Sequence, residues 1–298
     1  MVFSLHSFIL RSVLVIAAVG VVPIASAQLE VRMEPTQRTF VAHSPVYVKV
    51  TIMNRSSNSI TLRGPSRTSS WLNFRVLDNK QNMITSRRDA PLAAPLTVEA
   101  SKQVSLKVNL NKAYPMNRFG NYQVVANVYN PTSKSFTSSA SKLITVDEAK
   151  SIWTQTVGLD GGRKVEYSLL SYRGFDKTHL YYRLKNAETG FIRKTYQLGD
   201  LIQYRAPQAA VDRSHRMHVL YQAAPRQYIH DQINSDGKFL TRKVYEDYKG
   251  SRPELLQSKD GNVRVSGGIN PEVKSSEKRE KLKELSRIRR LSDRPPGY

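Results

Sequence analysis

Hydrophobic and polar residues alternate along several short stretches in the first half of the chain. Residues 46–52 and 104–110 show it most clearly, with apolar side chains at every second position: Val46, Val48, Val50 and Ile52, then Val104, Leu106, Val108 and Leu110. A period of two places such side chains on one face of a strand. Similar stretches at 59–64, 71–79, 120–130 and 135–146 are separated by polar turns. About seven strands in roughly 120 residues are typical of an antiparallel β-sandwich.

Two local motifs refine this prediction. The stretch Gly120-Asn121-Tyr122-Gln123-Val124 is similar to a tyrosine corner, and Trp71 stands where a third strand would carry a core tryptophan. Residues 29–146 therefore resemble the immunoglobulin-like fold. The resemblance implies that Trp71 packs in the core and that Tyr122 makes the corner hydrogen bond. The cysteine pair of antibody domains is missing, and the fold implies no particular function.

The second half contains a pattern that recurs. His179-Leu180-Tyr181-Tyr182 aligns with His218-Val219-Leu220-Tyr221, and a third piece spans Asp260–Gly268. Asp236-Gly237 between two apolar residues predicts a β-hairpin. A period near 40 residues resembles β-propeller blades over about 163–268. A closed ring needs about four blades, more than this region holds. Packed hairpins, a small sheet or a ring shared between chains remain open.

These patterns predict an all-β chain: an N-terminal antiparallel immunoglobulin-like sandwich, a second antiparallel domain of repeated hairpins and a short C-terminal helix. The expected division is a signal peptide at 1–27, the sandwich at 28–147, a linker at 148–162, the hairpin domain at 163–271 and a basic tail at 272–298. A short helix is expected within 147–153. In the tail, apolar residues recur every three positions, at Leu282, Leu285, Ile288 and Leu291.

The first residues indicate export. An apolar stretch over Val13–Val22 precedes Pro23 and the small-residue sequence Ala25-Ser26-Ala27, so we expect cleavage before Gln28. The apolar stretch is shorter than the roughly 20 residues that cross a bilayer, and no span is predicted after cleavage. The chain has no cysteine, which excludes disulfides, thiol catalysis and Cys-bound metal. The bacterial periplasm or the extracellular space is the expected location.

Charge suggests the class of partner. Lys and Arg number 46 against 24 Asp and Glu, a formal net charge of +22. Such a field attracts anionic polysaccharide or lipid headgroups, and another envelope protein is a further possible partner. Nucleic acid is disfavoured because of the predicted export and because no recognition motif is present. Tyr181, Tyr228 and Arg226 are the candidate ligand contacts, since tyrosine rings stack on sugars and arginine binds acidic groups.

No catalytic residue, metal ligand or cofactor is predicted. Asp212, Ser214 and His215 are neighbours in one turn and cannot form a triad. His215 and His218 are three residues apart, which places them on opposite faces of a strand. We therefore expect a non-enzymatic binding or structural protein of the cell envelope. The alternative is a carbohydrate-active enzyme in which two carboxylates converge, from the set Glu166, Asp176, Glu188 and Asp200.

Overall fold

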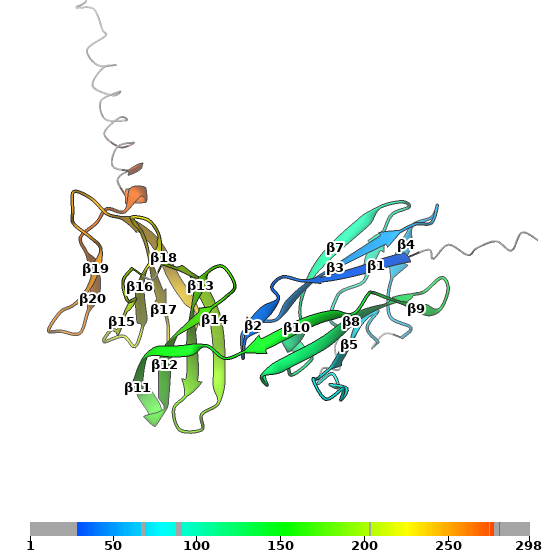
Figure 1. The fold of residues 1–298 in the computed structure, drawn as a ribbon, viewed down its shortest axis with the longest axis horizontal. Helices are drawn as coiled ribbons and strands as arrows, with labels where there is room; N and C mark the ends of the chain where they lie inside the picture. The colour runs from blue at the N-terminus through cyan, green and yellow to red at the C-terminus, as the bar shows by residue number, and fades with distance from the viewer. Residues whose placement is uncertain are drawn as a thin grey trace, which may run out of the picture.

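The described part of the protein is built mainly of β-strands (Figure 1). The computed structural model describes residues 29–273 except 67–68, 88–90 and 203, together with 275–276 and 280. Several antiparallel sheets confirm the predicted all-β class. Helical residues follow the last strand at 271–273, 275–276 and 280. The predicted signal peptide and the apolar positions of the tail lie outside the described residues.

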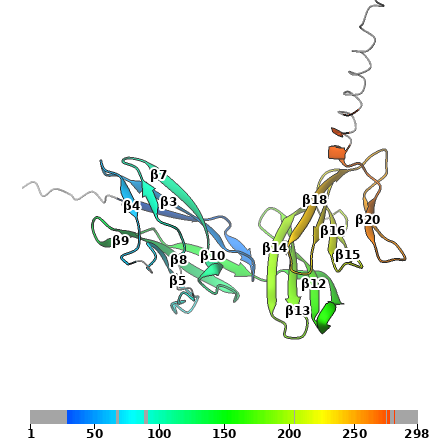
Figure 2. The same ribbon diagram turned by 180° about the vertical axis from the view of Figure 1, so that it is seen from behind.

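The first β unit is a sandwich of two main sheets (Figure 2). One sheet has the order β1-β3-β7, formed by Leu29–Pro35, Tyr47–Asn54 and Gln103–Asn109. The other has the order β2-β10-β8-β5, formed by Thr39–Val41, Lys142–Asp147, Gly120–Asn130 and Leu72–Leu77, with β9 (Ser135–Ser138) paired to β8. A small sheet joins β4 (Ile60–Leu62) to β6 (Leu96–Val98). A 3-10 helix, η1 (Leu110–Lys112), follows β7.

Both sheets contribute to one core, as the alternating pattern predicts. Val48, Val50 and Ile52 of β3 are fully buried against Val124 and Ala126 of β8 and their neighbours. Because side chains on a strand point alternately to its two faces, every second residue reaches this core.

The two motif residues behave as expected. Trp71 is buried and donates from Nε1 to Ala94 O at 2.9 Å. Tyr122 is buried and donates from its hydroxyl to Arg118 O, four residues upstream, at 2.7 Å. That bond is the predicted corner hydrogen bond.

The second β unit contains two four-stranded antiparallel sheets in chain order. The first is β11-β12-β13-β14, formed by Lys150–Gly158, Lys164–Arg173, Thr178–Asn186 and Ile192–Leu201. The second is β15-β16-β17-β18, formed by Gln208–Val211, Met217–Ala224, Gln227–Ile233 and Phe239–Glu246. A hairpin follows, β19 (Glu254–Gln257) with β20 (Val263–Ser266). Buried residues of both four-stranded sheets form one core, so the sheets pack against each other.

Two expectations for this half need correction. The short helix expected within 147–153 is absent: Lys150–Gly158 is strand β11, which pairs with β12 inside the stretch predicted as a linker. The alignment of His179 with His218 joins unlike positions, because β13 is the third strand of its sheet and β16 the second. Both are central strands with long buried runs, and this shared burial makes their sequences similar.

The third piece of the proposed repeat starts β20 of the two-stranded hairpin, not another four-stranded sheet. The Asp236-Gly237 hairpin is confirmed between β17 and β18. Within the described part of the chain, no helix is long and apolar enough to cross a membrane.

Candidate functional site

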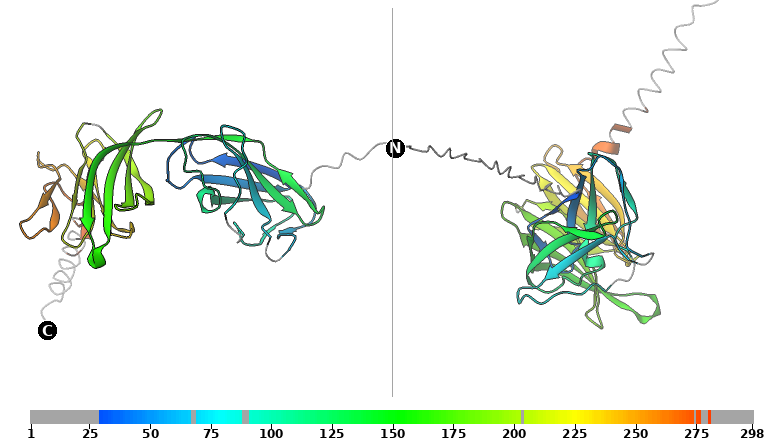
Figure 3. Two further views of the ribbon diagram at one scale, coloured as in Figure 1. Left: turned by 90° about the horizontal axis from the view of Figure 1, so that it is seen from below. Right: turned by 90° about the vertical axis from the view of Figure 1, so that its right-hand side faces the viewer.

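The two β units meet at a small apolar cluster. Viewed from below, the chain passes from one unit to the other close to the end of β10 (Figure 3). Val41 of the sandwich and Ala149 of the connection pack with Leu170 and Tyr181 of the second unit, and all four are buried. Gln37 Nε2 also donates to Gln197 Oε1 at 3.0 Å across the contact. The junction is thus a packed interface rather than a simple tether.

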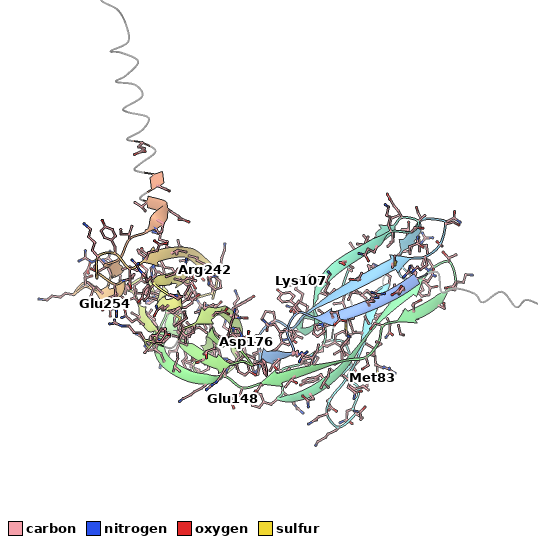
Figure 4. All side chains as sticks on the ribbon, turned by 45° about the horizontal axis from the view of Figure 1, so that its top comes forward. Met83, Lys107, Glu148, Asp176, Arg242 and Glu254 are labelled. Atoms are coloured by element: carbon pink, nitrogen blue, oxygen red, sulfur yellow. The ribbon has the colours of Figure 1, made fainter. Side chains whose placement is uncertain are left out.

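Arg183 of β13 crosses this junction. Its Nη2 donates to Ala42 O of the sandwich at 2.9 Å, and its Nε donates to Thr195 Oγ1 at 3.0 Å. Burial lowers the pKa of this guanidinium, and Glu148 near the connection (Figure 4) partly offsets that effect. No carboxylate among the described residues lies within ion-pair distance of Arg183. A partly buried cation paired only with neutral oxygens leaves a positive field at the junction.

A groove of about 160 Å³ is lined in part by Thr195, which accepts the hydrogen bond from Arg183 Nε. The sandwich contributes the turn after β2 and the residues around η1, and the second unit contributes the start of β14. The lining residues are His43, Pro45, Asn109, Asn111, Lys112, Arg193, Lys194, Thr195 and Tyr196. Four of these are basic, and none of the lining residues that the structure describes is acidic. We call this surface the junction groove.

The polar atoms of the junction groove are not all satisfied. Asn111 Nδ2 donates to Ser44 O at 2.7 Å, whereas Asn111 Oδ1 is buried without a donor among the described residues. Burial and the charge of Arg183 lower the pKa of His43, which favours its neutral form. Arg193 Nη2 lies 3.7 Å from Asp236 Oδ1, which is not part of the lining, and Lys194 Nζ donates to Gly237 O at 3.4 Å. The groove therefore offers cationic side chains and a neutral imidazole, a set suited to an anion that also carries hydroxyl groups.

The structure buries two of the three predicted ligand contacts. Tyr181 is 3% exposed in the junction cluster, and Tyr228 is 6% exposed on β17. Tyr181 lies on a central strand inside the apolar cluster, and Tyr228 lines a hollow of about 20 Å³, which is too small for a sugar ring. Arg226 is exposed in the β16–β17 turn and lines a hollow of about 660 Å³ that contains both arginine and acidic side chains.

The four carboxylates of the alternative prediction fall into two groups, one at each end of β13. Asp176 and Asp200 lie near the start of β13, where Asp200 pairs with Lys177 at 2.9 Å. Glu166 and Glu188 lie near the other end of β13, where Glu166 pairs with Lys185 at 2.8 Å. The nine residues of β13 separate the two ends, which at about 3.3 Å per residue exceeds the span of a glycosidase carboxylate pair. A catalytic pair would therefore have to come from one end, where Asp200 and Glu166 are each paired with a lysine.

The histidines take part in a buried polar network that the sequence did not reveal. His218 Nε2 lies 3.1 Å from Asp212 Oδ2, and Arg216 Nε donates to the same oxygen at 2.7 Å. His230 of the neighbouring strand stacks on His218. His215 lies instead in the turn before β16, where its carbonyl accepts from Tyr167 Oη at 2.7 Å. Only the pairing of β16 with β17 brings His218 and His230 together.

This network does not form a metal site. No group of three or more metal-ligating side chains gathers anywhere in the described part of the chain. His218 already uses one ring nitrogen on a carboxylate and the other on His230. The arrangement suits a structural hydrogen-bond chain.

Comparison with known proteins adds little to this description. No protein-family model and no curated protein matches the chain. Among solved structures, the sporulation control protein Spo0M from Bacillus subtilis is similar at 9% identity and a TM-score of 0.29, covering 56% of this chain and 83% of that chain. A similarity at this level supports no conclusion about this chain.

Proposed function

We propose that this protein is a non-enzymatic binding protein of the cell envelope that holds an anionic polymer or surface in the junction groove. The observation that carries the proposal is the charge of that groove. Lys112, Arg193 and Lys194 line it, and no described lining residue is acidic. Arg183, which donates to the lining residue Thr195, has no carboxylate partner among the described residues. The net charge of +22 would increase the rate of encounter with such a partner.

The chemistry of the groove favours an acidic glycan over a bare phosphate. Lysine and arginine side chains bind sulfate, carboxylate or phosphate groups. The neutral His43 imidazole in the lining can exchange a hydrogen bond with a sugar hydroxyl. Export through the predicted signal peptide would bring the protein to the compartment where such polymers lie. Lipid headgroups and acidic envelope proteins are the competing partners.

The test compares two triple variants of chain 28–298 with equal loss of charge. The first removes the groove cations: Lys112→Ala, Arg193→Ala and Lys194→Ala. The second removes three exposed cations away from the junction: Arg63→Ala, Lys134→Ala and Lys259→Ala. Each is titrated calorimetrically with a sulfated hexasaccharide, with anionic phosphatidylglycerol vesicles and with duplex DNA over a range of salt concentrations.

We expect the groove variant to lose at least about tenfold in affinity for the hexasaccharide, because each charged hydrogen bond contributes about 1.5–3 kcal/mol. The control variant should lose only the small part of its affinity that follows from its lower net charge. Equal losses in both variants, or binding to all three ligands that salt abolishes, would mean that only general electrostatics operates, and the proposal would fail.

A further inference from the structure

A second hollow lies in the sandwich, at the end of the β-sheet that approaches the second unit. It has a volume of about 520 Å³. Two segments form it: Asp78–Arg87, which follows β5, and Pro115–Tyr122, which leads into β8. Met83, in the first segment, is labelled at the margin of the sandwich in Figure 4. We call this hollow the corner pocket, because Tyr122 of the tyrosine corner lines it.

The backbone of the corner pocket is fixed by hydrogen bonds. The Tyr122 hydroxyl holds Arg118 O. Asp78 Oδ1 accepts from the backbone N–H groups of Lys80 and Asn82, at 2.8 Å each. The backbone N–H of Arg87 donates to Ala113 O at 2.8 Å, which ties the two segments together. A site fixed in this way loses little conformational entropy when a ligand binds.

One glycine brings the two segments into contact. Gly120 has φ +135°, in the region that favours glycine. A Cβ atom there would lie 3.5 Å from Asn79 Nδ2, so the Asn79 side chain rests against the Gly120 backbone. The amide group of Asn79 is thereby positioned at the wall of the corner pocket.

The side chains of the corner pocket have the chemistry of a sugar site. Phe119 is 58% exposed although it is a large apolar residue. Arg87 and Arg118 form no ion pair, and the amide groups of Asn79 and Asn117 form no hydrogen bond, with any residue that the structure describes. The Asp78 carboxylate accepts hydrogen bonds from Lys80 and Asn82 of its own turn. An exposed ring, free amides and two free guanidinium groups therefore line one hollow.

We propose that the corner pocket binds one carboxylated sugar residue of an acidic glycan. Phe119 covers the apolar face of the pyranose ring, since aromatic faces pack on such C–H surfaces. Arg87 and Arg118 hold the carboxylate, whose planar geometry matches the guanidinium fork. Asn79 and Asn117 exchange hydrogen bonds with the ring hydroxyls. This site goes beyond the proposed function, because it shares no residue with the junction groove.

The test uses chain 28–298 and a tetrasaccharide of alternating glucuronic acid and N-acetylglucosamine. Chitotetraose is the neutral control, and inorganic sulfate is the control for charge alone. Binding is followed by amide chemical-shift changes and by calorimetry. We expect a Kd of about 1 mM or tighter, with shifts concentrated in residues 78–87 and 115–122.

Two variants and one matched control complete the test. Phe119→Ala and Arg118→Ala should each lower the affinity for the acidic tetrasaccharide by about tenfold. Phe175→Ala removes an equally large exposed ring from the β12–β13 turn, outside the corner pocket, and should change nothing. Folding of each variant is checked by its amide spectrum.

Three results would overturn the inference: no binding of the acidic tetrasaccharide, binding that Phe119→Ala leaves unchanged, or equal binding of chitotetraose or sulfate. The triple variant of the junction groove is run in parallel. It should keep the shifts at residues 78–87 and 115–122, so that failure of the corner pocket and failure of the junction groove give different results.

Discussion

His218 Nδ1 lies 3.1 Å from His230 Nε2, with the two rings stacked at 22° between their planes. The groups around this pair determine which ring nitrogens carry a proton. His218 Nε2 donates to the Asp212 carboxylate, so in neutral His218 the Nδ1 atom is an acceptor. His230 must then donate from Nε2. This leaves His230 Nδ1 as a bare acceptor, and it is indeed buried without a partner among the described residues.

The bare nitrogen makes His230 resist protonation. A proton on Nδ1 would create a buried cation, without an acceptor for the new N–H, in the field of His218 and Lys243. Burial is the main reason why the pKa of His230 falls to about 4, and the charges of His218 and Lys243 lower it further. Burial also lowers the pKa of His218, although Asp212 opposes this. Both rings are neutral in the native protein at neutral pH.

We predict that stability falls as pH decreases from about 6.5 to about 4. In this range the unfolded chain binds a proton at His230, whose unfolded pKa is near 6.5, and the native protein does not. The free energy of unfolding should therefore decrease by about 1.4 kcal/mol per pH unit from His230 alone. His218 adds to this decrease in the upper part of the range. Urea unfolding at a series of pH values measures the slope.

The variant His230→Gln isolates this contribution. The glutamine Nε2 group can still donate to His218 but does not titrate. The free energy of unfolding should then depend less steeply on pH, by about 1.4 kcal/mol per pH unit between pH 6 and pH 4, because unfolding no longer takes up a proton at residue 230. An unchanged slope would show that the native His230 ring accepts a proton freely and that the assigned tautomer is incorrect.

The sequence was most informative where one face of a strand is buried and the other exposed. Alternation located β3, β5, β7 and β8, and local motifs located Trp71 and Tyr122. It was least informative for central strands. β13 and β16 are buried on both faces, so their sequences do not reveal their position in a sheet or show that Tyr181 is covered.

Neither candidate site was predictable, for a related reason. The junction groove combines the turn after β2, η1 and β14, which lie far apart in sequence. Lys112, Arg193 and Lys194 are ordinary surface residues in the sequence, and only the contact between the two units brings them together. Similarly, the corner pocket forms where two loops lie side by side, and the sequence does not show how close they are. The motif at Tyr122 indicated only that one of these loops is fixed.

Gly237 should tolerate substitution worse than Gly190. Both have φ near +70° and lie in hairpin turns, so alanine strains the backbone of each by a similar amount. At Gly190 a Cβ atom meets nothing within 4 Å, whereas at Gly237 it would lie 2.8 Å from Lys194 Cδ and 3.2 Å from Leu184 Cδ2. Gly190→Ala should destabilise by about 1 kcal/mol, and Gly237→Ala by about 1–3 kcal/mol more. If urea unfolding showed the same loss of stability for both variants, the Gly237 turn would not be crowded against β13 and β14.

Arg242 should be important for stability because it neutralises a fully buried carboxylate. Its Nε and Nη2 atoms each donate to Asp231 at 2.7 Å, and Nη2 also donates to Leu198 O. Burial raises the pKa of Asp231, and the two bonds from Arg242 oppose that effect. Arg242→Ala should destabilise by about 3–5 kcal/mol at neutral pH, because it leaves a buried charge without a partner.

Two comparisons distinguish this effect from a simple loss of side-chain contacts. Arg173→Ala, at an exposed end of β12, should change stability by less than about 0.5 kcal/mol. The double variant Asp231→Asn with Arg242→Ala should be more stable than Arg242→Ala alone, since the uncompensated charge is gone. A double variant that is less stable than the single one would show that Arg242 acts mainly through packing.

Tyr181 should determine how firmly the two β units hold each other. Its ring fills the space between Val41 and Leu170, and burial raises the pKa of its hydroxyl to about 12. Tyr181→Phe keeps the ring and should preserve the arrangement of the units. Tyr181→Ala removes it and should cost about 3–5 kcal/mol of packing, leaving mainly the hydrogen bonds of Gln37, Arg183 and Tyr172 across the junction. Residual dipolar couplings measured for each unit should then fit one alignment tensor in the parent and in Tyr181→Phe, but two different tensors in Tyr181→Ala. A single tensor in all three proteins would mean that polar contacts suffice to hold the junction, and the groove would keep its shape without the apolar cluster.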